Sequence, residues 1–250
     1  PDGLVYNELI APDGGGLQRK NSLESCADNN DDNLWDGVDL NRNYGYYWGY
    51  DDEGSSPDGC EQTYRGLGPF SEPETDAIKN LVEQHDFKIA LNYHSYGNIL
   101  IYPFGWTYDM DPPEADFEIF TEFGTEMTQF NGYDIGTGPE LLYPVNGEAC
   151  DWMYGSENIF AYTPEVGNDN DGFWPASDRI IPLAEENLYP NQFLSLVVGS
   201  KYNLHISLNS DEFLLGEDYS LSLEITNSGL SDSNGELTID IISSNSIFFE

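Results

Sequence analysis

Apolar and polar residues follow three different patterns along the chain. Helical spacing, with apolar residues three and four positions apart, predicts helices over 71–84, 112–131, 148–154 and 182–198. Shorter apolar runs predict strands over 87–91, 141–147 (a strand and turn) and 159–165. Residues 1–36 are rich in turn residues and are expected to be loops. Helices interspersed with buried strands indicate an α/β fold, a mixed twisted β-sheet flanked by helices.

The pattern changes to strict alternation after Gly199-Ser200. Period-two segments predict strands over 204–208, 219–225 and 237–241. Such strands, separated by turn residues, are typical of an antiparallel β-sandwich of the immunoglobulin-like kind. We therefore expect two domains, a larger one over 1–199 and the start of a β-sandwich module over 200–250.

The net charge of the chain limits the kinds of molecule that it can bind. The chain carries 46 acidic and 8 basic residues, a formal net charge of −38. Long-range repulsion excludes nucleic acids and anionic membranes as partners. No run of 18 apolar residues occurs, so no membrane span is expected. The acidity indicates a solvated surface, and the sequence leaves the oligomeric state open.

His94 is the first candidate for chemistry. It follows the strand predicted over 87–91, at the carboxyl end where open α/β sheets place their ligand crevices. A histidine there suits a metal ligand or a base. A single histidine is more commonly a core residue satisfied by a neighbour, so its role depends on partners elsewhere in the chain.

Further candidates occupy loops and strand ends. Arg19 is one of four arginines, retained in a very acidic chain, and Asn41-Arg42 offers an amide beside a guanidinium fork that suits a carboxylate. Tyr143 is expected at a rim, and Glu165 closes an apolar strand, as a general base would. Taken singly, each also fits a surface ion pair or a turn residue.

Several short motifs together resemble a known family. They are Pro1-Asp2-Gly3, Arg19-Lys20-Asn21, Gly37-Val38-Asp39-Leu40-Asn41-Arg42-Asn43, His94-Ser95-Tyr96, Tyr102-Pro103-Phe104-Gly105, Tyr143, Asp151-Trp152, Glu165 and Pro175-Ala176-Ser177. Their order and spacing over residues 1–199 resemble the zinc carboxypeptidases of the pancreatic carboxypeptidase A and bacterial carboxypeptidase T type. The resemblance implies a zinc-dependent exopeptidase that releases the C-terminal residue of peptides.

The resemblance also implies a role for each candidate. His94 matches a zinc ligand. Glu165 matches the base that activates the attacking water and protonates the leaving amine, and Arg19 matches the arginine that polarises the scissile carbonyl. Asn41, Arg42 and Tyr143 match the residues that hold the substrate's terminal carboxylate. Tyr96 matches a residue that contacts the penultimate residues of the substrate.

The side-chain pocket is implied in the same way. Its walls and floor match Ile101, Leu142, Val145, Glu148, Cys150 and Thr163. Cys150 takes the floor position, and a buried cysteine behaves as a small hydrophobe. We therefore expect a preference for hydrophobic or aromatic C-terminal residues, although the Glu148 carboxylate in the wall could also accept Lys or Arg.

One family motif is not in the chain. The resemblance places two zinc ligands in a His-x-x-Glu motif before the Asn-Pro-Asp-Gly turn, within which this sequence starts. Catalytic zinc requires three protein ligands, and neither His85 nor His205 is expected to substitute. The chain is therefore interpreted as an N-terminally truncated carboxypeptidase, inactive alone, whose full-length protein binds one zinc ion.

Cysteine pairing and location follow from the resemblance too. It implies a Cys26–Cys60 disulfide, which leaves Cys150 as a free thiol and favours a secreted, extracellular protein.

Two other functions remain open from the sequence. One is a zinc amidase or deacylase of related fold acting on murein or acyl-amino acids, against which Asn41-Arg42 and Tyr143 argue. The other is a non-catalytic secreted binding module, against which Glu165 and Arg19 argue.

Overall fold

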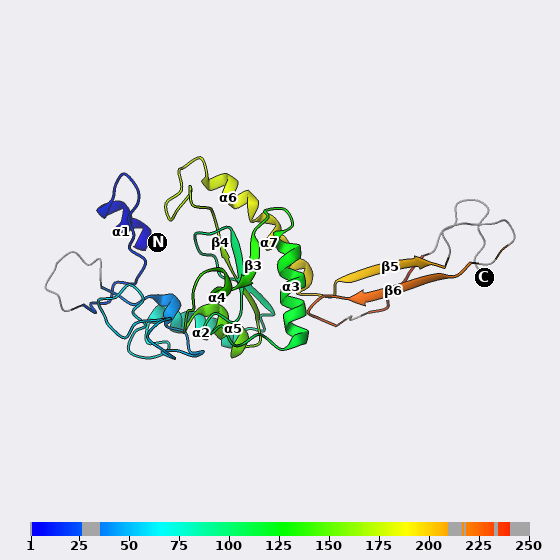
Figure 1. Cartoon of the computed structure of the whole chain (residues 1–250), viewed down its shortest axis with the longest axis horizontal. Coiled ribbons are helices and arrows are strands. Elements are labelled where there is room, and N and C mark those ends of the chain that lie inside the picture. The colour runs from blue at the N-terminus through cyan, green and yellow to red at the C-terminus, as the bar shows by residue number, and fades with distance from the viewer. Residues whose placement is uncertain (1, 27–35, 210–216, 218, 233–234, 241–250) are drawn as a thin grey trace. The chain divides into compact units, whose positions relative to one another are not determined.

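A computed structural model describes residues 2–26, 36–209, 217, 219–232 and 235–240 of the chain. These residues divide into two compact units, Pro1–Leu194 and Ser195–Glu250. The first contains a sheet with helices, and the second contains a two-stranded hairpin (Figure 1).

A four-stranded mixed sheet organises the first unit. Its strands are β1 (Ile89–Leu91), β2 (Ile99–Tyr102), β3 (Asp134–Thr137) and β4 (Phe160–Glu165). They lie in the order β1-β4-β2-β3, with β1/β4 and β2/β3 parallel and β2/β4 antiparallel. The register pairs Ala90 with Ala161 and Leu100 with Pro164. The mixed sheet predicted from the sequence is confirmed.

The structure describes eight helical segments. They are α1 (Asp2–Ile10), the 3-10 helix η1 (Leu40–Arg42), α2 (Pro73–Gln84), α3 (Glu114–Thr128), α4 (Gly138–Leu141), α5 (Ala149–Gly155), α6 (Ile180–Glu186) and α7 (Leu188–Val197). Of these, α3, α4 and α5 contact this sheet. The long helix α3 runs beside β3 and β2 (Figure 1). Helix α5 packs against β4.

Helix α3 buries three of the four large apolar side chains that its spacing predicts on the inner face, and Phe117 is the exception. Phe120, Phe123 and Met127 are at most 1% exposed, whereas Phe117 is 36% exposed. Phe120 stacks on Tyr102 of β2 with a centroid separation of 5.6 Å. Tyr162 of β4 donates its hydroxyl to the Phe120 carbonyl at 3.1 Å. Burial of these large apolar side chains, about 1.5–3 kcal/mol each, fixes α3 on the sheet.

Two segments have a different secondary structure from the one that the sequence predicts. Residues 2–10, expected to be loop, form α1, and the turn cluster at 13–16 follows the helix rather than preventing it. No strand forms over 141–147, where a strand and turn were predicted. Leu141 instead ends the single helical turn α4. Pro139 in its first turn and a Thr137 N–H···Glu140 Oε2 bond of 2.9 Å favour that helix.

Two helix ends also differ. Ser71 does not cap α2 with Glu74 as predicted; Glu72 takes the N-cap position before Pro73, and the Ser71 hydroxyl donates to the Glu72 carboxylate at 2.7 Å. The single helix predicted over 182–198 is broken between α6 and α7. Asn187 lies at that break and its side-chain amide donates to the Leu183 carbonyl at 3.0 Å.

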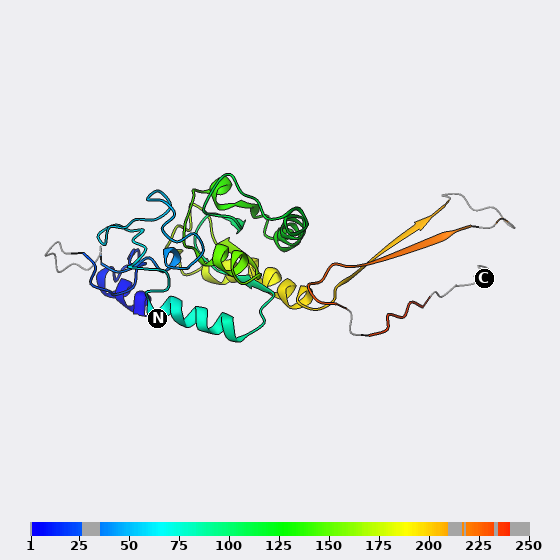
Figure 2. The same ribbon diagram turned by 90° about the horizontal axis from the view of Figure 1, so that it is seen from below.

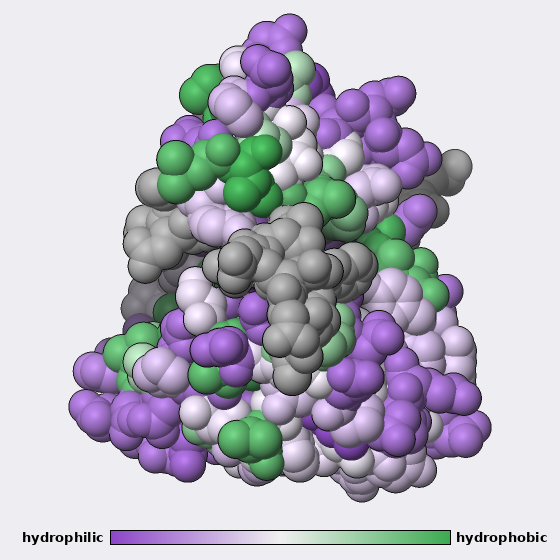
Figure 3. Space-filling view, turned by 90° about the vertical axis from the view of Figure 1, so that its left-hand side faces the viewer, coloured by the Kyte–Doolittle hydropathy of each residue, from purple (hydrophilic) through white to green (hydrophobic). Residues whose placement is uncertain are grey.

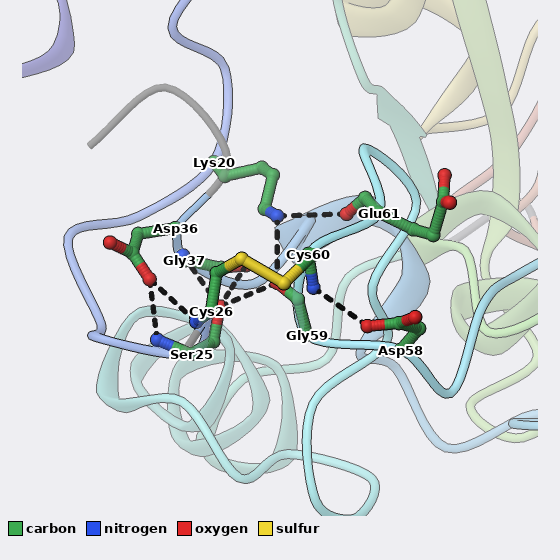
Figure 4. The surroundings of a disulfide bond; sticks show 9 residues. All are labelled: Lys20, Ser25, Cys26, Asp36, Gly37, Asp58, Gly59, Cys60 and Glu61. Atoms are coloured by element: carbon green, nitrogen blue, oxygen red, sulfur yellow. Dashed lines mark hydrogen bonds between the residues drawn. A yellow bond between two sulfur atoms is a disulfide. The ribbon is translucent and has the colours of Figure 1, made fainter. Parts of the chain in front are cut away.

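A disulfide joins the N-terminal loops. Cys26 and Cys60 are bonded across a sequence separation of 34, which confirms the predicted pairing (Figure 4). Cys150 is a buried free thiol. The backbone N–H groups of Ser25 and Cys26 both donate to Asp36, and these bonds lower the pKa of that carboxyl. The disulfide therefore anchors the loop that follows Arg19.

The second unit contains a hairpin of β5 (Tyr202–Leu208) and β6 (Leu221–Asn227), which run antiparallel as predicted (Figure 2). Leu204 pairs with Ile225 and Ile206 with Leu223. Residues 237–240 form no strand, and 241 lies outside the described residues, so the third predicted strand is not found. The predicted sandwich remains a prediction, since the described part of this unit contains only two paired strands.

The face of the molecule shown in Figure 3 is mostly hydrophilic, in keeping with the many acidic residues of the chain, and hydrophobic side chains are scattered across it. Within the described ranges, no helix is long and apolar enough to cross a membrane.

Candidate active site

An open cleft of about 1320 Å³ lies in the first unit. Eight of the nine site residues expected from the sequence line it: Arg19, Asn41, Arg42, His94, Tyr96, Tyr143, Glu148 and Glu165. They come from loops and from strand and helix ends that are far apart in the chain. The fold therefore gathers the candidates into one place.

His94 and Glu165 meet at the ends of two paired strands. His94 follows β1 and Glu165 ends β4, and the two residues form a parallel β-bridge. The His94 N–H donates to the Pro164 carbonyl at 2.8 Å, and Val166 N–H donates to the His94 carbonyl at 2.9 Å. The backbone thus fixes an imidazole and a carboxylate side by side at one sheet edge.

Burial changes the pKa of both groups. It lowers the pKa of His94, with Asp39 acting in the opposite direction, so the imidazole is held neutral. Glu165 is 9% exposed, and burial raises its pKa to about 7 while Arg19 and Arg42 oppose the change. A carboxyl with such a pKa can take up and release a proton near neutral pH.

Arg19, Asp39 and Arg42 form what we call the arginine cluster. Arg19 is ion-paired to the buried Asp39 carboxylate, which lies 3.8 Å from Arg42 Nη1. Arg42 is 3% exposed and donates Nη1–H to the Asn41 carbonyl at 2.9 Å. Its buried Nε has no hydrogen-bond partner among the described residues. The cluster therefore holds two guanidinium groups against one carboxylate, with an unsatisfied donor at the cleft.

The remaining expected contacts surround this cluster. Asn41 is fixed by its side-chain oxygen, which accepts the Ala149 N–H at 3.0 Å. Tyr143 is 52% exposed on the rim. Tyr96 packs edge-on against Phe173 at 4.9 Å between ring centroids. The cleft is thus lined both by hydrogen-bond donors and by aromatic rings.

Glu148 and Asp151 form a second group, the carboxyl pair. Glu148 is 6% exposed and lines the cleft, and Asp151 is fully buried behind it. Their side chains are hydrogen-bonded to each other. Asp151 also accepts the Gly105 N–H at 2.8 Å and the Trp106 N–H at 3.1 Å. A hydrogen bond between two carboxyl groups requires a proton on at least one of them, because an ionised carboxylate can only accept.

The pKa shifts of the carboxyl pair follow from this arrangement. Burial raises the pKa of Glu148 to about 7, with Glu165 acting in the same direction and Arg42 against it. Burial and Glu148 raise the pKa of Asp151 well above its usual range, although two backbone N–H bonds oppose this. The pair therefore titrates as a unit.

Cys150 is the expected site residue that does not line the cleft. It is 1% exposed, and its thiol donates to the Ala161 carbonyl at 3.2 Å. Burial raises the pKa of this thiol, so it stays neutral. Cys150 packs in the core beneath the wall, and Glu148 is the neighbouring side chain that reaches the cleft.

Two residues of the site were missed as candidates from the sequence. Asp39 stands two positions before Asn41, whose N–H it accepts at 3.2 Å as the N-cap of η1. An acidic residue just before an arginine-containing turn was the available signal. Asp151 stands three positions after Glu148, at a spacing that places both on one side of a helical turn.

A metal ion would find one suitable ligand in the part of the chain that the structure describes. His94 is half-buried, lines the cleft and is neutral, the form of imidazole that binds zinc. No group of three His, Cys, Asp or Glu side chains there is placed to hold a metal ion. His94 therefore fits as one member of a larger ligand set.

Several known proteins are similar to this chain in sequence. A zinc carboxypeptidase from Simulium vittatum is 34% identical over 204 residues, covering 75% of this chain and 61% of its own length. Zinc carboxypeptidase A 1 from Drosophila melanogaster is 33% identical over 206 residues, covering 75% of this chain and 43% of its own. The chain thus spans about half the length of such relatives.

Solved structures of carboxypeptidases have a fold similar to that of this chain. The crystal structure of carboxypeptidase A from Helicoverpa armigera matches with a TM-score of 0.64 and 28% identity, over 78% of this chain and 48% of that one. Bovine thrombin-activatable fibrinolysis inhibitor, in complex with tick carboxypeptidase inhibitor, matches with a TM-score of 0.63 and 26% identity, over 76% of this chain and 64% of that one. The family profile described as zinc carboxypeptidase matches residues 1–190. The chain belongs to the zinc carboxypeptidase family.

Proposed function

We propose that the full-length protein, meaning this chain together with the preceding part of the family domain, is a secreted zinc-dependent carboxypeptidase that releases the C-terminal residue of peptides. The observation that carries the proposal is that the arginine cluster, His94 and Glu165 all line one cleft. The buried Arg42 suits a terminal carboxylate, and His94 with Glu165 suits hydrolysis.

Recognition of the terminal carboxylate rests on Asn41, Arg42 and Tyr143. The Arg42 guanidinium is buried beside the cleft with its Nε unsatisfied by any described group. A bound carboxylate would supply acceptors, and charge-assisted bonds of this kind are the strong ones. Asn41 and the exposed Tyr143 hydroxyl add donors on either side. This arrangement favours a free C-terminus over an internal peptide bond.

Hydrolysis uses Glu165 and Arg19. Glu165, with a pKa of about 7, accepts a proton from the attacking water and then delivers it to the leaving amine. The Arg19 side chain is 45% exposed, so it can donate to the scissile carbonyl oxygen as negative charge develops there. Tyr96 contacts the penultimate residues. Zinc, with His94 as one ligand, would polarise the carbonyl and activate water when bound.

The nature of the released residue depends on the pocket walls. Ile101, Val145 and Thr163 line the cleft beside Glu148, and Cys150 packs beneath them. These walls support a preference for hydrophobic or aromatic C-terminal residues. The Cys26–Cys60 disulfide supports secretion, since disulfides persist in oxidising compartments.

The chain alone should lack activity. His94 is one ligand of the three that catalytic zinc requires, and the other two are expected from the preceding family segment. We expect residues 1–250 alone to hold no stoichiometric zinc and the full-length protein to hold one zinc ion per chain. Metal analysis of both after dialysis checks this, and one zinc ion on residues 1–250 alone would mean that His94 has ligand partners within them.

The test of the proposed function is Glu165→Gln in the full-length protein. The change should lower kcat by about 10²–10⁴-fold, because the amide cannot accept the proton. Zinc content and folding should remain as in the wild type, because Glu165 is proposed as a base and not as a ligand. Retention of more than about a tenth of the activity would contradict the base role. Glu118→Gln, on the exposed side of α3, is the matched control.

A further inference from the structure

The carboxyl pair is not needed for the proposed chemistry, yet it occupies the wall of the same cleft. Burying two carboxyl groups is costly unless they are paired or protonated. Glu148 is 6% exposed and Asp151 0%, and no lysine or arginine forms an ion pair with either among the described side chains. A hydrogen bond between the two takes the place of such a cation.

The surrounding structure holds the pair in place. Gly105 and Trp106 donate backbone N–H groups to Asp151 at 2.8 and 3.1 Å, which orients that carboxyl. Gly105 also leaves the room that Glu148 fills, because a Cβ on residue 105 would lie 2.0 Å from Glu148 Oε1. The Glu148 carboxyl is therefore fixed at the cleft wall by the fold and does not swing out to water.

The charged and titratable groups facing the pair are few. Arg42 acts on Glu148 from η1, and Glu165 acts on it from the end of β4. The neutral thiol of Cys150 lies next to both carboxyls, and Tyr46 faces Asp151. Arg42 is the group proposed to hold the substrate's terminal carboxylate, which would offset its charge in the complex. The charge of the pocket wall is then set by the protons on the pair.

We propose that the Glu148–Asp151 pair determines which C-terminal residue the pocket takes, and that it does so by its protonation. With both carboxyls protonated the wall is neutral, and the pocket takes an apolar or aromatic side chain. When the pair loses one proton, the wall carries one negative charge that Asp151 and Glu148 share, and the pocket takes a lysine or arginine side chain. This inference rests on the proposed carboxypeptidase function.

The direction of the change with pH follows from the raised pKa values. Below about pH 7 the Glu148 carboxyl is protonated, and above it the pair is ionised. A substrate lysine, with an ordinary pKa of about 10.4, stays positively charged throughout. Discrimination in favour of a terminal lysine should therefore rise as pH rises through about 7.

The experiment compares two peptides that differ only in ending with Lys or with Met, which has a similar length and no charge. The ratio of their kcat/KM values on the full-length zinc protein is measured from pH 5.5 to 8.5. The ratio cancels the titration of Glu165 and of any other group that acts equally on both peptides. It should increase by up to about tenfold per pH unit below the midpoint and then level off.

Two variants test whether the pH dependence of the ratio comes from Glu148. In Glu148→Gln the ratio should lose its pH dependence and, at pH 8, lie at least about tenfold below the wild-type value, since the buried charge is gone. Glu118→Gln should keep the wild-type profile. The infrared band of a protonated carboxylic acid gives a reading without turnover: it should weaken in the wild type as pH rises through 7 and be reduced in Glu148→Gln.

The outcomes separate the two proposals. If neither peptide is cleaved, the proposed function fails. If both are cleaved with a ratio independent of pH, or if Glu148→Gln keeps the wild-type slope, the carboxyl pair does not set specificity while the carboxypeptidase assignment stands. The wild-type profile and the infrared band decide the matter even if the variant does not fold.

Discussion

The arginine cluster and the carboxyl pair occupy the same cleft and stabilise buried charge in opposite ways. In the cluster, Asp39 lies between two arginines, so opposite charges offset one another. In the pair, two carboxyls lie side by side, so protons replace the missing cations. A site of the second kind changes its charge when the pair loses a proton, as the raised pKa of Glu148 implies.

The two regions also depend on different features of the sequence. In the cluster, Asp39 caps the helical turn that contains Arg42, whereas Arg19 joins Asp39 from 20 residues away in the sequence. The pair is held by a contact between Gly105 and Asp151, which are 46 residues apart. A local motif can therefore reveal part of the cluster, whereas the support of the pair exists only when the chain is folded.

The largest effect is expected where the cluster loses one of its two guanidinium groups. Arg42→Ala should lower kcat/KM for peptides with a free C-terminus by about 10²- to 10³-fold, because it removes the proposed carboxylate partner and leaves Asp39 with less compensation. Arg42→Lys keeps the charge but loses the fork, so it should recover only part of the activity. Steady-state kinetics on the full-length protein measures both. A loss below about fivefold in Arg42→Ala would remove Arg42 from carboxylate recognition.

An intermediate effect is expected from crowding the pair. Gly105→Ala would place a Cβ 2.0 Å from Glu148 Oε1 and should lower the free energy of unfolding by about 1–3 kcal/mol. Gly68→Ala, where a Cβ would meet no atom within 4 Å, is the matched control. Urea denaturation of each variant gives the comparison. In a Glu148→Ala background the Gly105→Ala penalty should shrink, and an unchanged penalty would show that Glu148 does not fill this space.

The smallest effect concerns stability and pH. Folding raises the pKa of Glu148 from the ordinary 4.5 to about 7, so the folded state binds more protons between these values and stability falls as pH rises through them. The slope is at most about 1.4 kcal/mol per pH unit for one proton. Glu148→Gln should flatten the slope, as measured by urea denaturation at pH 5 and 7.5. Glu165 contributes in the same direction to both proteins, so an identical slope in the two would contradict the shift.

Strands β1 and β4 could be predicted because they are apolar runs, whereas β2 was not predicted although it is one too. Strand β4 is buried along most of its length, as its apolar composition predicts. The edge strand β3 was missed, since Asp134 and Gly136 break any apolar pattern and pairing with β2 defines the strand. The hairpin shows the converse: β5 alternates clearly, yet all its residues are exposed in the second unit. Periodicity predicts a strand, but it does not supply the partner that buries its face.

The candidate site could be predicted where a residue's chemistry is local. Glu165 was identifiable because a carboxylate ends an apolar strand, and Arg42 because it follows an asparagine in a very acidic chain. Cys150 was expected in the pocket, but the helix geometry of α5 points its thiol to the Ala161 carbonyl instead. The proton shared by Glu148 and Asp151 depends on burial, which no local pattern encodes.

The central claim is that Arg42, together with Asn41 and Tyr143, binds a free terminal carboxylate. The most direct measurement compares kcat/KM of the full-length zinc protein on one peptide with its C-terminal amide. A site built to bind the carboxylate should prefer the free acid by at least about 100-fold, because the amide leaves the buried Arg42 without an anionic partner. Equal rates on the acid and the amide would contradict the account and favour an amidase or an endopeptidase.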